Sequence, residues 1–204
     1  MRVASAERGL LDGSDPVFRA DDEAVLRGAA AFETLRVYDG RPFLLGEHLA
    51  RFRRSTAALA LPPADGVEQL VERLVEDGDG VLRLYRTSLD VVATLSPLPG
   101  GLDEQRARGI ALRSIDLGAP ALLEGVKSTS YATAFAARRD AEAKGADDAL
   151  LVAAGIVLET ATANIWWRRG DRLFTPSVRA GVLPGVTRGF LLGGENAAEG
   201  SFPL

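Results

Sequence analysis

The sequence contains no cysteine and a single histidine, His48. Zinc sites are built mainly from cysteine and histidine, so a zinc site in this chain would need carboxylates for most of its ligands. A Ser-His-Asp triad could use only His48. We therefore predict no metal site, and we assign His48 a structural or capping role near the start of a helix.

The chain also lacks any run of about 18 apolar residues, the length needed for a membrane-spanning helix, and its first residues form no hydrophobic signal segment. Its 24 basic and 28 acidic residues give a net charge of -4 and form no basic stripe that would bind nucleic-acid phosphates. The 204 residues, 47% of them hydrophobic, can bury a core as one large or two small domains. We expect a cytoplasmic protein without nucleic-acid or membrane partners.

Lysine is scarce in a chain that otherwise uses arginine, and only Lys127 and Lys144 are present. A scarce residue type is either incidental surface charge or is retained for a chemical reason. Surface charge is the commoner explanation on composition alone, so Lys127 becomes a candidate for chemistry only through its position in the sequence.

Hydrophobic periodicity predicts strands and helices in both halves of the chain. Asp39 and Gly40 form a strong turn signal between two extended segments, which indicates a β-hairpin. Pro62 and Pro63 end the helical pattern that begins at Glu47. We predict strands at 32–38, 41–45, 110–115, 149–153, 156–160, 164–169 and 172–175, and one or two strands at 82–95. We predict helices from 47 to the two prolines, at 67–76 and at 131–144.

A stretch rich in proline and glycine, followed by charged residues, interrupts this pattern at 97–108. We place an interdomain linker in that stretch. The prediction is an α+β protein with a small N-terminal domain at 1–96 and a larger, cofactor-binding domain at 109–204.

Lys127 follows a predicted strand and precedes a predicted helix. A lysine held rigidly at such a junction can form a Schiff base if desolvation or a neighbouring positive charge keeps its amine deprotonated. Tyr131, four residues later, could hydrogen-bond a phenolic oxygen or could simply pack against the helix. Glu159 ends an apolar strand, where a carboxylate either faces water or pairs with a protonated ring nitrogen.

Pro184 and Gly185 stand at the predicted start of a further helix and are followed by Val186 and Thr187. Backbone N–H groups at a helix start can bind an anion, and Thr187 adds a hydroxyl. An ordinary helix start explains the same pattern. Arg51 lies beside two further arginines, which is typical of a solvated helix face, although one inward-pointing arginine would suit a phosphate.

Taken in order, six blocks of the sequence resemble the class IV aminotransferase family of pyridoxal 5'-phosphate enzymes. The resemblance implies the two-domain fold type IV, which is D-amino-acid aminotransferase-like, and it extends from about Gly28 to Arg188. Six blocks in the right order are far more specific than any one of them. The blocks are 32–36 (Phe-Glu-Thr-Leu-Arg), 47–52, 127–131, 145–151, Glu159 with 164–165, and 183–188.

The resemblance implies a role for each matching residue. Lys127 would be the Schiff-base lysine and proton shuttle, Glu159 would pair with the pyridine nitrogen, and Tyr131 would contact the ring hydroxyl. A pyridine kept protonated by Glu159 acts as an electron sink, while Lys127, once released, is free to move a proton. The implied phosphate-binding residues are Arg51, Val186 and Thr187.

Within the family, the blocks at 32–36 and 163–170 are most similar to 4-amino-4-deoxychorismate lyases, which eliminate pyruvate and form 4-aminobenzoate, a folate precursor. Thr34 stands where branched-chain aminotransferases tend to have glycine. An aminotransferase acting on branched-chain or D-amino acids and a catalytically silent member of the fold stay open as alternatives. Substrate choice is expected to depend on the small domain, where Arg83 is a candidate partner for a substrate carboxylate.

Two features depart from the family pattern. The glycine-rich approach that usually precedes the Phe-Glu pair is Arg-Gly-Ala-Ala-Ala at 27–31. The sequence also stops at Leu204, whereas family members continue through further strands, a helix and a Ser/Thr-rich loop, so we expect the C-terminal part of the fold to be shortened. Because family members pair with the cofactor near the subunit interface, a homodimer is the expected assembly.

Overall fold

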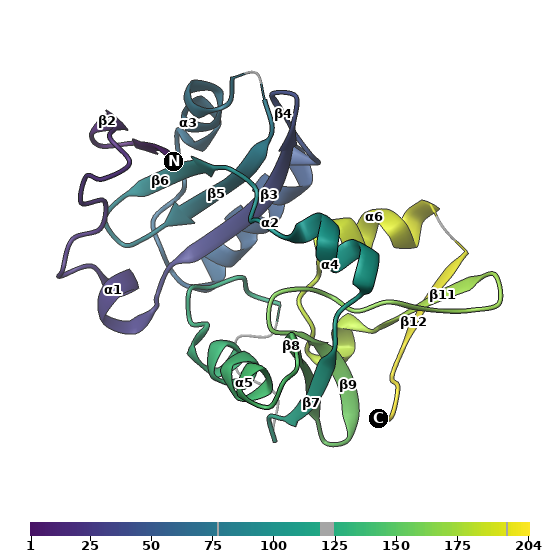
Figure 1. Ribbon diagram of the computed structural model, residues 1–204. Coiled ribbons are helices and arrows are strands. Elements are labelled where there is room, and N and C mark those ends of the chain that lie inside the picture. Colours follow the sequence, from purple (N-terminus) through teal and green to yellow (C-terminus); the bar gives the residue numbers. More distant parts are fainter. Residues whose placement is uncertain (77, 119–124, 195) are drawn as a thin grey trace. The chain divides into compact units, whose positions relative to one another are not determined.

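A computed structural model of the chain shows an α+β fold, with strands and helices in both halves of the sequence (Figure 1). The residues that it describes are 1–76, 78–118, 125–194 and 196–204. Contacts between residues divide the chain into two units. Unit 1 contains Met1–Gly100 and Val126–Ser130, and unit 2 contains Gly101–Gly125 and Tyr131–Leu204. The short segment that carries Lys127 thus belongs to unit 1, whereas the sequence predicts it in the C-terminal domain at 109–204.

Unit 1 is built on a six-stranded antiparallel sheet with the strand order β2-β1-β6-β5-β3-β4. Its strands are β1 (Arg2–Ser5), β2 (Gly9–Leu11), β3 (Ala31–Tyr38), β4 (Arg41–Pro42), β5 (Gly80–Arg86) and β6 (Val91–Ser96). Buried and half-buried residues alternate along β3 and β5. Successive side chains of a strand point to opposite faces, so the sheet has a core face and a less buried face.

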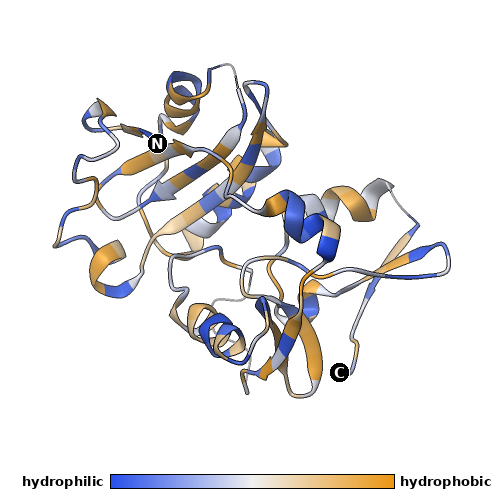
Figure 2. Ribbon diagram, viewed as in Figure 1, coloured by the Kyte–Doolittle hydropathy of each residue, from blue (hydrophilic) through white to orange (hydrophobic). Residues whose placement is uncertain are grey.

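Two helices, α2 (Leu45–Ala58) and α3 (Val67–Leu74), pack on the core face of this sheet (Figure 1). Both mix polar and apolar residues along their length, as amphipathic helices do (Figure 2). Phe52 of α2 is fully buried in the shared core, and burying a side chain of this size stabilises the fold by roughly 1.5–3 kcal/mol. The buried residues of α3 are Val67, Leu70, Val71 and Leu74.

The hairpin predicted around Asp39 and Gly40 is confirmed. Both residues have positive φ angles, 44° and 72°, which a two-residue hairpin turn of this kind requires. Its second strand is shorter than predicted, because β4 ends at Pro42 and α2 begins at Leu45. Leu44 adopts a left-handed conformation immediately before the helix and turns the chain out of the sheet.

Unit 2 contains two three-stranded sheets, β7-β8-β9 and β10-β11-β12, each with one parallel and one antiparallel pair. Parallel neighbours need a crossover connection, and helix α5 (Ala132–Ala143) lies between β7 and β8 in the chain. The strands are β7 (Leu112–Asp116), β8 (Asp148–Ala153), β9 (Ile156–Thr160), β10 (Trp167–Arg169), β11 (Arg172–Pro176) and β12 (Ala197–Gly200).

The core of unit 2 forms between α5 and the first of these sheets. The buried residues of α5 are Ala137 and Ala141, and they pack with Leu151, Leu158 and Val182. Small alanines at these positions let the helix approach the sheet closely. The predicted helix at 131–144 is therefore confirmed to within one residue at each end.

Several elements were not predicted from the sequence. Helix α4 (Leu102–Arg108) occupies most of the stretch assigned to a linker, and it is polar along nearly its whole length, with no buried residue (Figure 2). Its pattern therefore lacks the apolar stripe by which helices are recognised. Helix α1 (Glu23–Arg27) is short, and the side chain of Asp22 caps its first turn by accepting from Ala24 N. The remaining unpredicted elements are β1, β2, β12 and the 3-10 turn Val178–Ala180.

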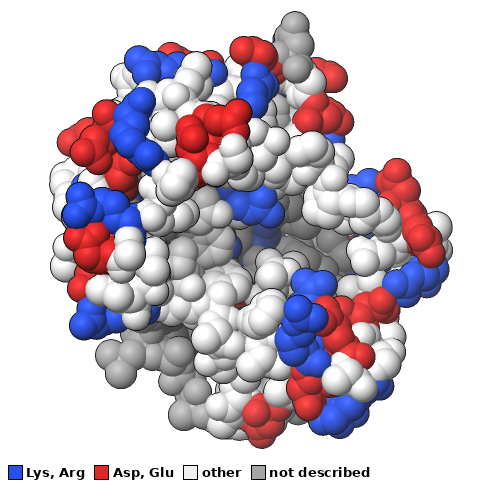
Figure 3. Space-filling model, turned by 60° about the vertical axis from the view of Figure 1, so that its left-hand side comes forward, with Lys and Arg blue, Asp and Glu red and all other residues white. Residues whose placement is uncertain are grey.

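Figure 3 shows the charged side chains on one face of the molecule. On the face shown in Figure 3, basic and acidic side chains lie next to one another rather than in a stripe of one sign. Within the described ranges, no helix has the length and apolarity to cross a membrane. Those same ranges contain no group of three or more histidine, aspartate or glutamate side chains that could hold a metal ion.

Candidate active site

Lys127 is buried, with an exposed fraction of 7%, although its amine carries charge in water. Its Nζ lies over the ring of Phe32, 4.3 Å from the ring centroid. An aromatic face is one of the few apolar surfaces that can accommodate a buried ammonium group, and it desolvates the amine at the same time. The amine of Lys127 thus lies against an aromatic ring of β3.

The backbone on either side of Lys127 is fixed to β3 and α2. The carbonyl of Lys127 accepts from Phe32 N at 3.0 Å, and its N–H donates to Ser55 Oγ at 3.1 Å. Two residues later, Thr129 N donates to Ala30 O at 2.8 Å. These bonds explain why the segment belongs to unit 1, and they place the lysine on a rigid support.

Glu33 is fully buried on the core face of β3 and contacts two residues of α2. Arg51 donates from Nε to Oε1 at 2.7 Å and from Nη2 to Oε2 at 2.6 Å, while His48 Nδ1 lies 2.8 Å from Oε2. Burial raises the pKa of Glu33, but the hydrogen bonds from Arg51 and His48 outweigh it, so the pKa lies below its usual value. The carboxylate is therefore ionised and binds the helix to the strand.

Of the three clustered arginines of α2, Arg51 points inward. It is 4% exposed, whereas Arg53 is exposed and pairs with Glu68. The inward arginine considered from the sequence is thus Arg51, and its guanidinium presents two nitrogens to Glu33. Its binding of a phosphate stays a prediction.

The less buried face of the unit 1 sheet carries Arg83 and Tyr85 of β5. The ring of Tyr85 stacks on that of Phe32, with 6.2 Å between the centroids, and burial raises the pKa of its phenol. Arg83 Nη1 donates to Ser96 Oγ at 3.2 Å. The guanidinium of Arg83 therefore shares a sheet face with the aromatic ring on which the amine of Lys127 lies.

Glu159 of β9 is held by two residues of unit 2, Asn164 and Leu183, which follow it by 5 and 24 residues in the sequence. Asn164 Nδ2 donates to Glu159 Oε2 at 2.9 Å, and Leu183 N lies 3.2 and 3.3 Å from the two carboxylate oxygens. The same Nδ2 also donates to Leu183 O at 2.9 Å. The carboxylate is thus orientated by N–H donors of unit 2.

Val186 and Thr187 are the first residues of helix α6 (Val186–Gly194). The first N–H groups of a helix have no partner within the helix and can bind an anion. Gly185 precedes them, and a Cβ at that position would lie 1.9 Å from Asn164 Oδ1. The predicted turn into a helix is confirmed, whereas the role of Val186 and Thr187 toward a phosphate stays a prediction.

Tyr131 occupies the N-cap position of α5, where its carbonyl accepts from Phe135 N at 2.8 Å. It is partly buried and belongs to unit 2. Its predicted contact with a cofactor hydroxyl stays a prediction.

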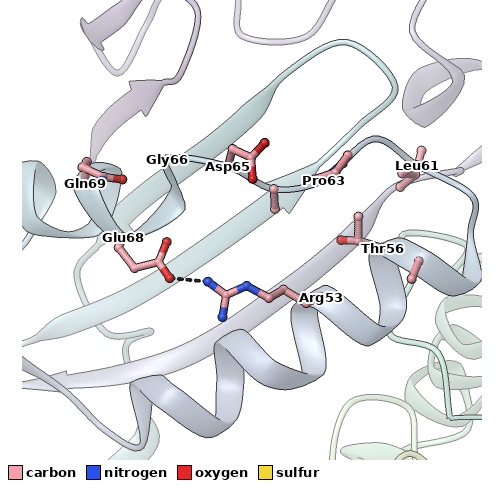
Figure 4. Close-up of a pocket in the computed structure, with 10 residues that line it drawn as sticks. Arg53, Thr56, Leu61, Pro63, Asp65, Gly66, Glu68 and Gln69 are labelled. Atoms are coloured by element: carbon pink, nitrogen blue, oxygen red, sulfur yellow. Dashed lines mark hydrogen bonds and ion pairs between the residues drawn. The ribbon is translucent and has the colours of Figure 1, made fainter.

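A pocket of about 430 Å³ opens on unit 1, between α2 and the start of α3 (Figure 4). Arg53 and Glu68 face each other across its lower side, joined by an ion pair. None of the predicted site residues lines it. The remaining lining residues are Thr56, Ala57, Leu61, Pro63, Ala64, Asp65, Gly66 and Gln69.

No role for Glu33 or Asn164 follows from the sequence alone, although both stand in blocks that carry the family resemblance. One feature of the sequence could have indicated a buried role for Glu33. It occupies an inward position on a strand whose other inward residues, such as Leu35 and Val37, are apolar. A charge at such a position needs a buried partner. No such feature indicates a role for Asn164, because its hydrogen bonds depend on where the turn at Leu183 lies in the folded chain.

Comparison with known proteins places this chain in one family. Residues 30–199 match the model of the family described as amino-transferase class IV. A bifunctional aminodeoxychorismate lyase/D-amino acid transaminase of Mycobacterium tuberculosis is 32% identical over 91% of this chain and 75% of its own length. An aminodeoxychorismate lyase of Bacillus subtilis is 28% identical over 93% of this chain and 71% of its own.

A solved structure shows the same fold. The PLP-bound form of a hypothetical aminotransferase from Mycobacterium tuberculosis superposes with a TM-score of 0.88 at 28% identity, and the match covers 100% of this chain and 82% of that one. The chain belongs to the class IV aminotransferase family, with the fold of type IV. Members of this family depend on pyridoxal 5'-phosphate.

Proposed function

We propose that this chain is a pyridoxal 5'-phosphate-dependent 4-amino-4-deoxychorismate lyase in which Lys127 carries the cofactor. The observation that carries the proposal is the placement of Lys127: a buried amine over the ring of Phe32, on a backbone bonded to β3 and α2. A nucleophilic lysine needs such a desolvated and rigid position. Two relatives support the lyase reaction. The relative from Bacillus subtilis is named as a lyase, and that from Mycobacterium tuberculosis is named as both a lyase and a transaminase.

The remaining residues fit the chemical groups of this cofactor. Glu159 offers a carboxylate orientated by Asn164 and Leu183, which suits a protonated pyridine nitrogen. Tyr131 would contact the ring hydroxyl. Once bound, the cofactor supplies an electron sink for charge that develops on the substrate. The proposed phosphate-binding residues are Arg51, Val186 and Thr187.

In the proposed reaction, Lys127 takes a proton from the substrate ring. The electron pair of the broken C–H bond makes the ring aromatic and expels the three-carbon enol ether group, which takes up a proton and leaves as pyruvate. The other product is 4-aminobenzoate. The reaction needs no oxidant, reductant or amino acceptor, and Arg83 would bind a carboxylate of the substrate.

An aminotransferase is the second candidate, because the relative from Mycobacterium tuberculosis is named as both a lyase and a D-amino acid transaminase. In that reaction Lys127 would move a proton between the α-carbon of a small amino acid, a D- or a branched-chain amino acid, and the cofactor. Both reactions use the same lysine and the same electron sink, so these residues do not distinguish them. A homodimer is part of this proposal, and light scattering of the purified protein would test it.

The first experiment is to record the absorption spectrum of the purified protein with added pyridoxal 5'-phosphate, before and after borohydride. We expect a visible band that borohydride converts to a stable adduct on the peptide containing Lys127. Lys127→Ala should abolish the band, whereas Lys144→Ala should retain it, because Lys144 is exposed and pairs with Asp140. A wild-type protein without a band would overturn the enzyme proposal and support a catalytically silent member of the family.

The second experiment distinguishes the two reactions. Incubation with 4-amino-4-deoxychorismate alone should release pyruvate and 4-aminobenzoate in equal amounts. Two results would favour the aminotransferase. One is product release that requires both an amino acid and a 2-oxo acid, and the other is transfer of an amino group between them without formation of 4-aminobenzoate.

A further inference from the structure

We infer that Asn164 is a positioning residue that joins Glu159 to the turn at the start of α6. The inference rests on the proposed function, because it concerns the residues assigned there to the pyridine nitrogen and the phosphate. Asn164 itself contacts the carboxylate and the turn, and it would act on the cofactor only through them.

The hydrogen bonds of Asn164 leave its amide little freedom. Nδ2 lies 2.9 Å from Glu159 Oε2 and 2.9 Å from Leu183 O, so its two hydrogens can serve one acceptor each. The Leu183 N–H completes the cluster by donating to the same carboxylate at 3.2 Å. One side chain thus orientates the carboxylate and fixes the backbone two residues before Gly185.

The oxygen of the same amide explains the glycine at position 185. A Cβ on Gly185 would lie 1.9 Å from Asn164 Oδ1 and 3.1 Å from its Cγ, closer than real Cβ contacts. Gly185 has no positive φ angle, so its backbone would accept alanine. The main obstacle is the amide, since the nearest atom of another residue, Arg188 Cβ, would lie 3.2 Å away. Position 185 therefore needs glycine because Asn164 occupies the space beside it.

The consequence is a mechanical link between two proposed ligand groups. Glu159 lies on β9, while Val186 and Thr187 begin α6, and Asn164 holds the carboxylate of the first against the turn that leads to the second. A shift of the turn would therefore rotate the carboxylate. A pyridoxal phosphate that is bound at both ends needs a constant distance between its nitrogen partner and its phosphate partner, and Asn164 supplies this constraint.

The packing part of the inference is tested without any cofactor, by urea unfolding of Asn164→Ala, Gly185→Ala and the double variant. Gly185→Ala should lower the unfolding midpoint in the wild-type background and lower it much less in the Asn164→Ala background, because the obstructing amide is gone. Gly189→Ala is the matched control, since it lies in α6 with no atom within 4 Å of an added Cβ. Additive effects of Gly185→Ala and Asn164→Ala would overturn this part.

The positioning part is tested by titrating pyridoxal 5'-phosphate into Asn164→Ala, Glu159→Gln and the double variant, with the visible band as the readout. If Asn164 acts through Glu159, Asn164→Ala should weaken binding by about tenfold or more, the effect of one hydrogen bond to a charged group. In the Glu159→Gln background, the loss should fall to less than about threefold. A purely structural role would give the same loss in both backgrounds and would overturn the inference.

The two experiments separate the failure of this inference from the failure of the proposed function. If the wild type binds no cofactor, the proposed function and the role of Asn164 toward the cofactor both fail, and the unfolding result alone decides the link between Asn164 and Gly185. If the wild type binds the cofactor and the losses are equal in the two backgrounds, only the positioning role fails.

Discussion

Glu33 and Arg51 form a two-point ion pair in the interior of unit 1, with Nε 2.7 Å from Oε1 and Nη2 2.6 Å from Oε2. The side chains are 0% and 5% exposed. In such a pair each charge compensates the other, and His48 adds one further hydrogen bond to the carboxylate. Because the pair joins β3 to α2, which also hold the segment of Lys127, its loss should affect both stability and the proposed site.

Glu33→Gln should lower the free energy of unfolding by about 3–5 kcal/mol, because it removes the buried negative charge that pairs with Arg51. Urea unfolding at pH 7 measures this change. Glu68→Gln is the matched control, since Glu68 pairs with Arg53 of the same helix at the surface, where such a pair contributes about 0–1 kcal/mol. Equal losses in the two variants would contradict the structural role of Glu33.

The contribution of Glu33 should depend on pH with a defined sign. Its pKa in the folded protein lies below the ordinary value of 4.5, so protons bind the unfolded state more readily and favour unfolding. The stabilisation is therefore complete above pH 4.5 and is lost as the pH falls through the lowered pKa. The difference in unfolding free energy between wild type and Glu33→Gln should be largest at neutral pH and shrink in acid, and a difference independent of pH would refute this assignment.

Asp147 should titrate at an unusually low pH. It accepts hydrogen bonds from Arg108 at 2.6 and 3.1 Å and from Ala111 N at 2.7 Å, and these bonds lower its pKa to about 2. Arg108→Ala removes the largest cause, so the pKa of Asp147 should rise toward 3.8. NMR titration of the carboxyl carbon measures the shift.

The control for Asp147 is Arg106→Ala. Arg106 lies on the same helix, α4, but pairs with the exposed Asp103. This variant should leave the titration of Asp147 unchanged. If both arginine variants raise the pKa equally, the cause is the general charge of α4 and not the contact with Arg108.

Arg83→Ala should raise KM for the carboxylate substrate by at least about tenfold, the effect of losing one hydrogen bond to a charged group. Its kcat should change little, because a carboxylate distant from the reacting atoms is bound equally in the ground state and the transition state. Arg41→Ala, on the edge strand β4 of the same sheet and exposed, is the matched control and should leave KM unchanged. A fall in kcat with constant KM would exclude a simple binding role for Arg83.

Local patterns were enough to predict most of the regular structure. The hairpin around Asp39 and Gly40 follows from the φ angles that this turn requires, and α3 follows from apolar residues at helical spacing. Elements without such patterns were missed. Helix α4 has no apolar stripe, and β1 is only four residues long and is held by pairing with β6, which lies about ninety residues later in the chain.

The residues of the candidate site likewise fall into those that the sequence indicated and those that only the tertiary structure revealed. The sequence by itself determined the family and marked Lys127, Glu159 and the start of α6, because those residues occur in blocks whose order is preserved. Only the tertiary structure showed that Glu33 binds Arg51 and His48, and that Asn164 binds Glu159 and excludes a side chain at position 185. Periodicity and turn preferences act over a few neighbouring residues, whereas these contacts join residues of separate elements, and strand pairing and helix packing decide which polar groups meet.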